Sequence, residues 1–590
     1  MRNLQICASH TAGPEPKWSG CNIRRFYYFK LICILFAFGF STALISTAQA
    51  SLTTLVSLDG VNGSWPYMAL TQGADGNFYG TTYEGGFSAN CIFAGGCGTV
   101  FKMTAAGKLT TIYNFCSLAN CTDGDNPVGS LVQGSDGSFY GTTSGGGTHS
   151  GGTVFQVTPA GKLITLYSFC ASANCSDGEG PTAGLVQSRN GNFYGTTQLG
   201  GNNGGGTVFE ITSTGNLITL YRFCAQPACT DGAEPMSGLV QATNGNFYGE
   251  TLFGGTGFGV IFEITPLGGL TTLFSFNGTD GSAPLGGLIQ AVDGGFYGVT
   301  TNGGTSGSLE CTGGCGTVFK ITAGGKLTTL YNFCSSVNCV DGARPYGPLV
   351  EGTDGNFYGT TSDFDVNNGT VFEITPRGTL TTLYSFCTLL NCEDGATPTV
   401  GLVQATNGTF YGTTSQSGSG GAGTIFSLST GLGAYLKTQP SSAKEGATVG
   451  IFGQGFSGSS VVRFGDVQAT NVKIFGTTFL TVKVPAGALS GPVTVTTGGT
   501  TLTSNQQFRV TPQVLGFNPP GGSVGTQVTI NGIGFQQALG VGFGDNVPAL
   551  FIVNSDTEVT ATVPAGAKTG QIRVVTIGGT GFSSATFTVN

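Results

Sequence analysis

The sequence has 590 residues, of which 103 are glycine and only 9% are charged, a composition that favours strands and turns over solvated helices. Its 22 basic residues are outnumbered by 30 acidic ones, so no basic surface is expected that could neutralise nucleic-acid phosphates or hold an anionic membrane. We therefore expect an all-β chain of several domains that does not bind nucleic acid.

Residues 1–50 have the features of an export signal. Two arginines and a lysine precede an apolar run from Leu31 to Ile45, and the small-residue tripeptide Ala48-Gln49-Ala50 follows it, as in a signal-peptidase site. The alternative is an uncleaved membrane anchor, but the run is shorter than the ~20 residues that span a bilayer. The sequence predicts a signal peptide over 1–50 and a mature chain that is not an integral membrane protein.

A phrase of the form Gly-Asn-Phe-Tyr-Gly-Thr-Thr recurs seven times between residues 76 and 414. The recurring phenylalanines are Phe78, Phe139, Phe193, Phe247, Phe296, Phe357 and Phe410. Their spacing of 49 to 61 residues is typical of β-propeller blades rather than of helical repeats of ~34 residues. In the third copy, β-type runs are expected at 184–187, 192–197, 206–212 and 217–223, and four strands make one blade.

The two ends of this region predict how the ring closes. The fourth-strand phrase, Leu-Thr-Thr-Leu-Tyr-Ser-Phe and its variants, occurs at 52–58 before the first repeat and is missing after the last one. The sequence therefore predicts a seven-bladed β-propeller over 51–430 whose last blade takes its fourth strand from 52–58. Such closure leaves no open strand edge for aggregation.

The cysteines also indicate export. After the signal there are 14, in seven close pairs, and local pairing fits disulfides in an oxidising compartment. The pairs are Cys91/Cys97, Cys116/Cys121, Cys170/Cys175, Cys224/Cys229, Cys311/Cys315, Cys334/Cys339 and Cys387/Cys392. Zinc is the alternative, but His149 is the only histidine after residue 50. We expect seven disulfides and an extracellular, cell-surface or periplasmic location.

Seven Asp-Gly pairs, from Asp59 to Asp394, each precede a proline by a few residues. Aspartates in such loops are usually turn-formers. Calcium is an alternative where two carboxylates are close, as at Asp123/Asp125 and Asp363/Asp365, but no run matches a calcium-loop signature. No metal and no other cofactor is assigned.

The C-terminal part contains a second repeat. Gly453-Gln-Gly-Phe456 matches Gly532-Ile-Gly-Phe535, and Val484-Pro-Ala-Gly487 matches Val563-Pro-Ala-Gly566, both 79 residues apart. Alternating apolar residues at 557–563 and 571–575 predict two immunoglobulin-like β-sandwiches, at 432–510 and 512–590.

Both repeats resemble known families. Residues 51–430 are similar to the GloVer-type tandem repeat proteins, and the two C-terminal modules resemble IPT/TIG domains through their G-x-G-F and VP-x-G motifs. The first resemblance implies an exported bacterial protein of poorly defined role, often with a C-terminal anchor; this sequence ends without an apolar anchor. The second implies spacer or adhesion modules.

No catalytic motif can be assembled from the sequence, so we expect a non-enzymatic binding or scaffold protein whose propeller face or IPT modules contact polysaccharide or an extracellular protein. The alternative is a carbohydrate-active enzyme, a lyase or glycosidase, using carboxylates on the loop-bearing face; it would be marked by an acid without a turn role, present in one blade only and pointing into the channel. Candidate ligand contacts are aromatic residues of the divergent loops: Tyr83, Phe87, Phe93, Phe253, Phe258 and Phe364.

Overall fold

The computed structural model describes residues 50–91, 95–188, 190–305, 311, 313–362, 368–544 and 547–590. The predicted signal peptide lies outside the described residues, apart from Ala50. The described chain is built from strands, with helical structure only as single 3-10 turns. The all-β prediction is confirmed.

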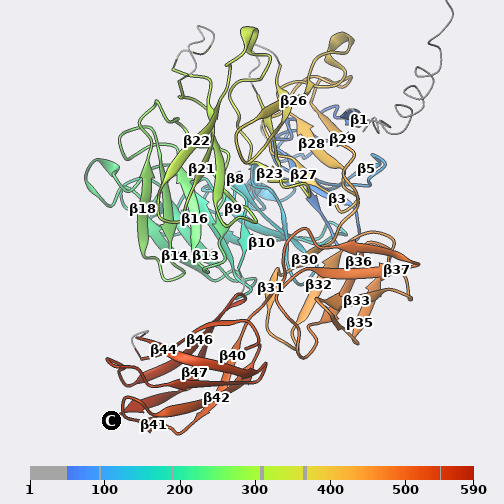
Figure 1. Cartoon of the computed structure of the whole chain (residues 1–590). Coiled ribbons are helices and arrows are strands. Elements are labelled where there is room, and N and C mark those ends of the chain that lie inside the picture. The colour runs from blue at the N-terminus through green and yellow to red at the C-terminus, as the bar shows by residue number, and fades with distance from the viewer. Residues whose placement is uncertain are drawn as a thin grey trace, which may run out of the picture. The chain divides into compact units, whose positions relative to one another are not determined.

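Between residues 51 and 429 the described chain forms seven antiparallel sheets of at least four strands each, which lie as repeated units in the blue-to-yellow part of Figure 1. We call them blades one to seven in chain order. The first strands are β2 (Thr71–Gln72), β7 (Val132–Gln133), β11 (Val186–Gln187), β15 (Val240–Gln241), β19 (Ile289–Gln290), β23 (Val350–Glu351) and β27 (Val403–Gln404). The second strands carry the Phe-Tyr-Gly phrase: β3 (Phe78–Thr82), β8 (Phe139–Gly145), β12 (Phe193–Thr197), β16 (Phe247–Thr251), β20 (Phe296–Thr300), β24 (Phe357–Thr361) and β28 (Phe410–Thr414).

The third strands are β4 (Thr99–Met103), β9 (Thr153–Val157), β13 (Thr207–Ile211), β17 (Val260–Ile264), β21 (Thr317–Ile321), β25 (Thr370–Ile374) and β29 (Thr424–Ser429). The fourth strands are β5 (Leu109–Asn114), β10 (Leu163–Ser168), β14 (Leu217–Arg222), β18 (Leu270–Ser275), β22 (Leu327–Asn332), β26 (Leu380–Ser385) and, in blade seven, β1 (Ser51–Ser57). Blade two has an extra short strand, β6 (Asp125–Pro127), which pairs with β8. The first strands are two residues long, shorter than the predicted four.

Strand β1 is the N-terminal element of the described chain, yet it pairs antiparallel with β29, near residue 429, with Ser51 opposite Ser429 and Ser57 opposite Thr424. The order of blade seven is therefore β1-β29-β28-β27. This pairing covers the edge of β29, which would otherwise present unpaired backbone groups. The segment predicted to supply the missing fourth strand does so.

The second strands form the seams between blades. Each Tyr ring packs on the Phe ring of the next blade, and the contact between Tyr411 and Phe78 links blade seven back to blade one. The seven ring pairs have centroid distances from 3.9 to 4.3 Å: Tyr79–Phe139, Tyr140–Phe193, Tyr194–Phe247, Tyr248–Phe296, Tyr297–Phe357, Tyr358–Phe410 and Phe78–Tyr411. The glycine after each Tyr is required by packing: a Cβ at Gly80 would lie 2.6 Å from the Phe101 ring. The repeated phrase is the buried seam of the ring.

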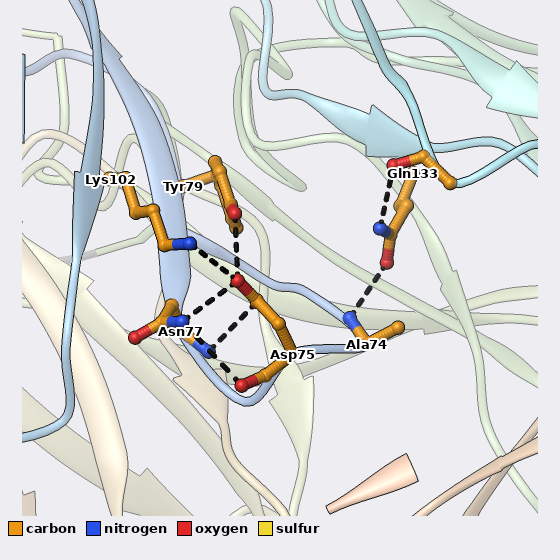
Figure 2. Close-up of polar contacts among 7 residues, drawn as sticks. Ala74, Asp75, Asn77, Tyr79, Lys102 and Gln133 are labelled. Atoms are coloured by element: carbon orange, nitrogen blue, oxygen red, sulfur yellow. Dashed lines mark hydrogen bonds and ion pairs between the residues drawn. The ribbon is translucent and has the colours of Figure 1, made fainter. Parts of the chain in front are cut away.

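Tight turns join the first and second strands, and Figure 2 shows the one in blade one. The Asp75 carboxylate accepts hydrogen bonds from the Asn77 side chain at 2.8 Å and the Tyr79 hydroxyl at 2.9 Å, and pairs with Lys102 Nζ at 2.7 Å. Burial raises the pKa of Asp75, but these partners outweigh it and hold the pKa below its usual value. We call the segment that joins β2 to β3, residues 73–77, and its six equivalents the hairpin turns.

The first strands add hydrogen bonds across the seams. The Gln133 Oε1 accepts a hydrogen bond from the Ala74 N–H of the preceding blade at 2.9 Å, as Figure 2 shows. Equivalent bonds join Gln290 to Thr243, Glu351 to Val292, Gln404 to Thr353 and Gln72 to Thr406. The last of these again joins blade one to blade seven, so the side chains of the first strands and the backbones of the turns hold the ring together.

The C-terminal residues form two further units of paired strands, each with its own buried core. The first contains β30 (Lys437–Gln439), β31 (Ser442–Ala443), β32 (Thr448–Phe452), β33 (Val461–Phe464), β34 (Val467–Gln468), β35 (Val472–Phe475), β36 (Phe479–Lys483), β37 (Val493–Thr497), β38 (Thr500–Thr503) and β39 (Arg509–Val510). The second contains β40 (Gln513–Asn518), β41 (Gly521–Gly522), β42 (Gln527–Ile533), β43 (Ala538–Phe543), β44 (Val547–Ser555), β45 (Glu558–Thr562), β46 (Gly570–Thr576) and β47 (Gly579–Val589). In the second unit β44 is one continuous strand that pairs with both β43 and β45, whereas β34 and β35 of the first are separate.

Candidate functional site

Longer segments connect the fourth strand of each blade to the first strand of the next, and we call them the entry loops; the entry loop of blade one is 58–70. Five of them contain a 3-10 turn closed by a cysteine: Ala119–Cys121, Ala173–Cys175, Pro227–Cys229, Val337–Cys339 and Leu390–Cys392. The structure joins all seven predicted cysteine pairs as disulfides. The Cys91, Cys97 and Cys116 sulfurs lie within 4.8 Å of one another, so the loops between second and third strands and the entry loops share one face.

A buried aspartate holds each cysteine-containing entry loop in shape. The Asp177 carboxylate accepts hydrogen bonds from the Tyr167 hydroxyl at 2.9 Å and from the N–H groups of Ala171 and Ser172. Its equivalents Asp123, Asp231, Asp341 and Asp394 have the same three kinds of donor. These residues are loop formers, as the sequence predicted.

Blade one departs from the predicted Asp-Gly pattern. The prediction included Asp59, but it is Asn62 whose Oδ1 accepts the Asp59 N–H at 3.1 Å, as Asp280 Oδ1 accepts the Asn277 N–H at 2.9 Å in blade five. Asp59 instead bonds the N–H groups of Val61 and Asn62. The Asn62-Gly63 pair therefore occupies the position that Asp280-Gly281 has in blade five.

The described residues give no independent support for a metal. Every group of ligand atoms close enough to hold an ion contains the two sulfurs of one disulfide. Both oxygens of Asp123 accept hydrogen bonds from the protein, and Asp363 and Asp365, the other pair considered for calcium, lie outside the described residues.

Blade one carries a cluster of three aromatic rings on the entry-loop face. The Trp65 ring stacks on the Tyr83 ring with a centroid distance of 6.5 Å and an interplanar angle of 13°. Tyr67 touches both, at 6.1 Å from Trp65 and 5.7 Å from Tyr83. Trp65 is 39% exposed, so one side of the cluster is open to solvent. We call Trp65, Tyr67 and Tyr83 the aromatic cluster.

Backbone hydrogen bonds hold the cluster in place. The Trp65 N–H donates to the Ala422 carbonyl of blade seven, and the Trp65 carbonyl accepts the Tyr83 N–H at 3.0 Å. From blade two, the Asn126 side-chain amide donates to the Tyr83 carbonyl at 3.0 Å. Three neighbouring blades thus fix the positions from which the rings project, so little loop entropy is lost when a ligand binds.

The surroundings of the cluster are acidic. Burial raises the pKa of Tyr67, and Tyr83, Glu84 and Tyr346 raise it further. Burial also raises the pKa of Tyr83, with contributions from Glu84 and Asp125. Both phenols therefore stay protonated at neutral pH and can donate hydrogen bonds, while the nearby carboxylates can accept them.

The other predicted contact residues do not join this cluster. Phe87 is 82% exposed, Phe253 47% and Phe258 42%, and no ring contact among the described residues links them to one another. Phe258 lies over Gly278, where a Cβ would be 3.3 Å from its ring. Phe93 and Phe364 lie outside the described residues. Of the six predicted residues, the structure places Tyr83 in a cluster.

Blade four contains an acid, Glu250, that meets part of the description given for an enzyme. Glu250 replaces the threonine of the repeated phrase and has no turn role. In four other blades that threonine donates to a carbonyl of the next blade, as Thr196 does to Ser237, whereas blade five has Val299 here. Its Oε2 accepts the Gly287 N–H at 2.9 Å, and Oε1 is buried without a hydrogen-bond partner. Burial raises the pKa of Glu250 to about 8. The side chain is only 1% exposed, so it lies in the seam between blades and not on an open surface.

Sequence reasoning missed two members of the aromatic cluster, Trp65 and Tyr67. The available signal was that Trp65 is the only tryptophan after residue 50 and directly precedes the proline of its entry loop. The predicted residues Phe87 and Phe93 belong instead to the segment between the second-strand phrase and Cys97.

Each of the two repeats of the chain matches a known family. The model of the Gloeobacter/Verrucomicrobia repeat matches residues 90–311 and 226–426, which together are more than half of the chain. The IPT/TIG domain matches residues 437–510 and 512–589. No curated protein matches the sequence.

Solved structures resemble the chain only distantly. A proposed gluconolactonase is 12% identical, with 66% of this chain and 94% of the other covered and a TM-score of 0.34. A fungal alcohol oxidase in complex with copper is 11% identical, with 91% and 98% covered and a TM-score of 0.35. A surface glycan-binding protein from Prevotella bryantii is 20% identical, with 27% and 39% covered and a TM-score of 0.20.

Proposed function

Because the chain belongs to the Gloeobacter/Verrucomicrobia repeat family and carries two IPT/TIG domains, we propose that it is an exported, non-enzymatic binding protein whose entry-loop face contacts polysaccharide. The observation that carries this proposal is the aromatic cluster of Trp65, Tyr67 and Tyr83. Its rings are in contact with one another, partly open to solvent, and held by hydrogen bonds from three blades.

The chemistry of the cluster suits a sugar. An aromatic face offers apolar area to the C–H face of a sugar ring, and Trp and Tyr do so with little loss of rotamer entropy. The phenol hydroxyls and the carboxylates of Glu84 and Asp125 can exchange hydrogen bonds with sugar hydroxyls. This combination of apolar platform and few polar groups is typical of small-molecule sites.

The cysteine chemistry supports a place outside the cytoplasm. Seven disulfides in one chain indicate an oxidising compartment, and we place the protein at the cell surface, outside the cell or in the periplasm. No helix in the described part of the chain has the length and apolar character to cross a membrane.

The proposal is tested by titration calorimetry of the full mature chain with cellohexaose, laminarihexaose, chitohexaose and hexagalacturonic acid. Trp65→Ala removes the exposed ring of the cluster and should weaken binding at least about tenfold, because central aromatic contacts carry much of a binding free energy. Phe87→Ala is the matched control, since it removes a more exposed ring that makes no ring contact among the described residues. Equal affinities of Trp65→Ala and the native protein would contradict the proposal, and binding of none of the four sugars would favour a protein partner.

A carbohydrate-active enzyme is the second candidate, and Glu250 is the observation that favours it. A carboxylic acid with a pKa near 8 can act as a proton donor at neutral pH. The test measures reducing ends released from the same four sugars over a day. Release by the native protein that Glu250→Gln abolishes would establish an enzyme, whereas binding without release supports the binding protein.

A further inference from the structure

Three positions around the entry loop have positive φ in all seven blades, and two of the three are glycine in every blade. The five loops with a cysteine-closed turn contain further residues with positive φ, such as Cys116 and Asn120. The first set, with φ from 94° to 132°, is Gly63, Gly124, Gly178, Gly232, Gly281, Gly342 and Gly395. The second set, with φ from 88° to 100°, is Gly98, Gly152, Gly206, Gly259, Gly316, Gly369 and Gly423. Glycine is the residue that adopts this conformation without strain.

The third position directly precedes the proline of the entry loop, and it differs from the other two. Its φ lies between 51° and 61° in all seven blades. Its residues are Trp65, Asn126, Gly180, Glu234, Ala283, Arg344 and Thr397. We call them the pre-proline positions. The backbone repeats, but no two side chains are alike.

Side chains at these positions carry an energetic cost. A left-handed conformation costs an L-residue about 1–2 kcal/mol, and among the six side chains only that of Asn126 is of a type that adopts it readily. Gly180 shows that the ring accepts glycine here. If the pre-proline positions had only to make a turn, glycine would be expected in all seven, as it is in the two neighbouring sets. Strain that persists where a cheaper residue would fit points to function.

The same backbone bonds fix how these side chains are presented. The carbonyl of the pre-proline residue accepts the N–H of the residue that follows the second strand: Tyr83 to Trp65, Leu252 to Glu234, Thr301 to Ala283, Ser362 to Arg344 and Ser415 to Thr397. Neighbouring blades are also linked by side chains here, because Gln198 Nε2 donates to Glu234 Oε2 at 3.1 Å. The pre-proline residues are therefore projected from equivalent places in successive blades.

We propose that the pre-proline positions are the specificity-determining positions of the glycan site, an inference that rests on the function proposed above. Trp65 supplies the stacking surface, and the other blades except blade three, which has Gly180, each contribute one side chain that accepts or rejects the sugars beyond it. Asn126 is the nearest, since its amide touches the Tyr83 carbonyl of the aromatic cluster. Glu84 directly follows Tyr83 and pairs with Ser64, the neighbour of Trp65, and Asp125 directly precedes Asn126. Two carboxylates therefore lie next to the cluster, so the ligand class is a neutral or amino sugar rather than a uronic acid.

The test exchanges pre-proline residues for glycine in the full mature chain. The variants are Glu234→Gly and Asn126→Gly, with Ala283→Gly as the matched control that removes strain but only one methyl group. Glu234→Gly and Ala283→Gly should melt at or above the native temperature, because they relieve the left-handed conformation. Asn126→Gly and Glu234→Gly should change the ratio of affinities for cellohexaose and chitohexaose at least threefold, and Ala283→Gly should leave it unchanged.

The outcomes separate this inference from the proposed function. If Trp65→Ala loses binding while Asn126→Gly and Glu234→Gly keep the native affinity ratio, the specificity role is overturned and the glycan site remains. If Trp65→Ala binds like the native protein, both fail together. If Glu234→Gly melts several degrees below the native protein, its side chain is held for stability and the inference fails. Tight binding of hexagalacturonic acid would overturn the assigned ligand class.

Discussion

The hairpin turns and the entry loops occur equally often in the same ring, but they repeat in different ways. In the hairpin turns, side chains and backbone repeat together: an Asp or Asn, its Gly, and the Tyr hydroxyl bonded to the Asp or Asn recur from blade to blade, as at Asp75 and Asp136. In the entry loops the backbone repeats and the pre-proline side chain changes. Where both repeat, the side chain is needed for folding; where only the backbone repeats, the side chain is free to serve recognition.

The entry loops occupy equivalent places only if all blades are held in one closed ring. Strand β1 closes that ring, so its removal should open it. Deleting Ser51–Ser57 exposes the edge of β29 and unpairs Leu52 from Leu428. We expect the melting temperature to fall by about 10 °C or more, measured by circular dichroism. The control is Val61→Ala, a change in an exposed side chain of the adjoining loop. A deletion variant that melts like the control would show that closure contributes little.

A smaller loss of stability is expected when the buried aspartate of an entry loop is removed, and a still smaller one when an exposed acid is removed. Asp177→Ala removes the acceptor of three hydrogen bonds at a side chain that is 4% exposed, and should cost about 2–4 kcal/mol of unfolding free energy. Asp59→Ala removes an exposed acceptor and should cost about 1 kcal/mol or less. Urea denaturation measures both; equal losses would remove the distinction between buried and exposed loop acids.

The third prediction concerns the pH dependence of stability that Glu250, a residue buried in a seam between blades, should cause. Glu250 keeps its proton in the folded protein up to about pH 8 but loses it near 4.5 when unfolded. Between these values the folded state binds more protons, so the unfolding free energy decreases as pH rises, by at most about 1.4 kcal/mol per unit. Glu250→Thr, which introduces the residue found in five of the other six blades, should remove this decrease. Parallel pH profiles of the two proteins between pH 5 and 8 would show that Glu250 titrates normally.

Much of the ring could be predicted because its sequence repeats from blade to blade. The third and fourth strands of the third copy were expected at 206–212 and 217–223, and β13 and β14 lie within those bounds. The closing strand followed from counting the fourth-strand phrase, and the cysteine pairs from the short distance between their members in the sequence. Strand β45 also lies within the predicted run at 557–563.

Features that depend on individual side-chain contacts and on backbone dihedral angles could not be predicted. The hydrogen bond from Ala74 to Gln133 joins residues 59 apart, and nothing in either repeat shows that they meet. The aromatic cluster joins two loops of blade one, and Asn62 rather than Asp59 takes the position that Asp280 has in blade five. The conformational free-energy cost at the pre-proline positions depends on the φ angle, which cannot be read from the sequence.

The pairing of β1 with β29 also determines how the molecule responds to force. Ser51 lies opposite Ser429, so the chain enters and leaves the ring at the same end of one strand pair. Tension applied between Ser51 and Ser429 would load the hydrogen bonds of this pair one after another, from that end inward, instead of all together. A pair loaded in this way unzips at low force. The ring is closed against aggregation, but stretching between its two connections would open it at a single place.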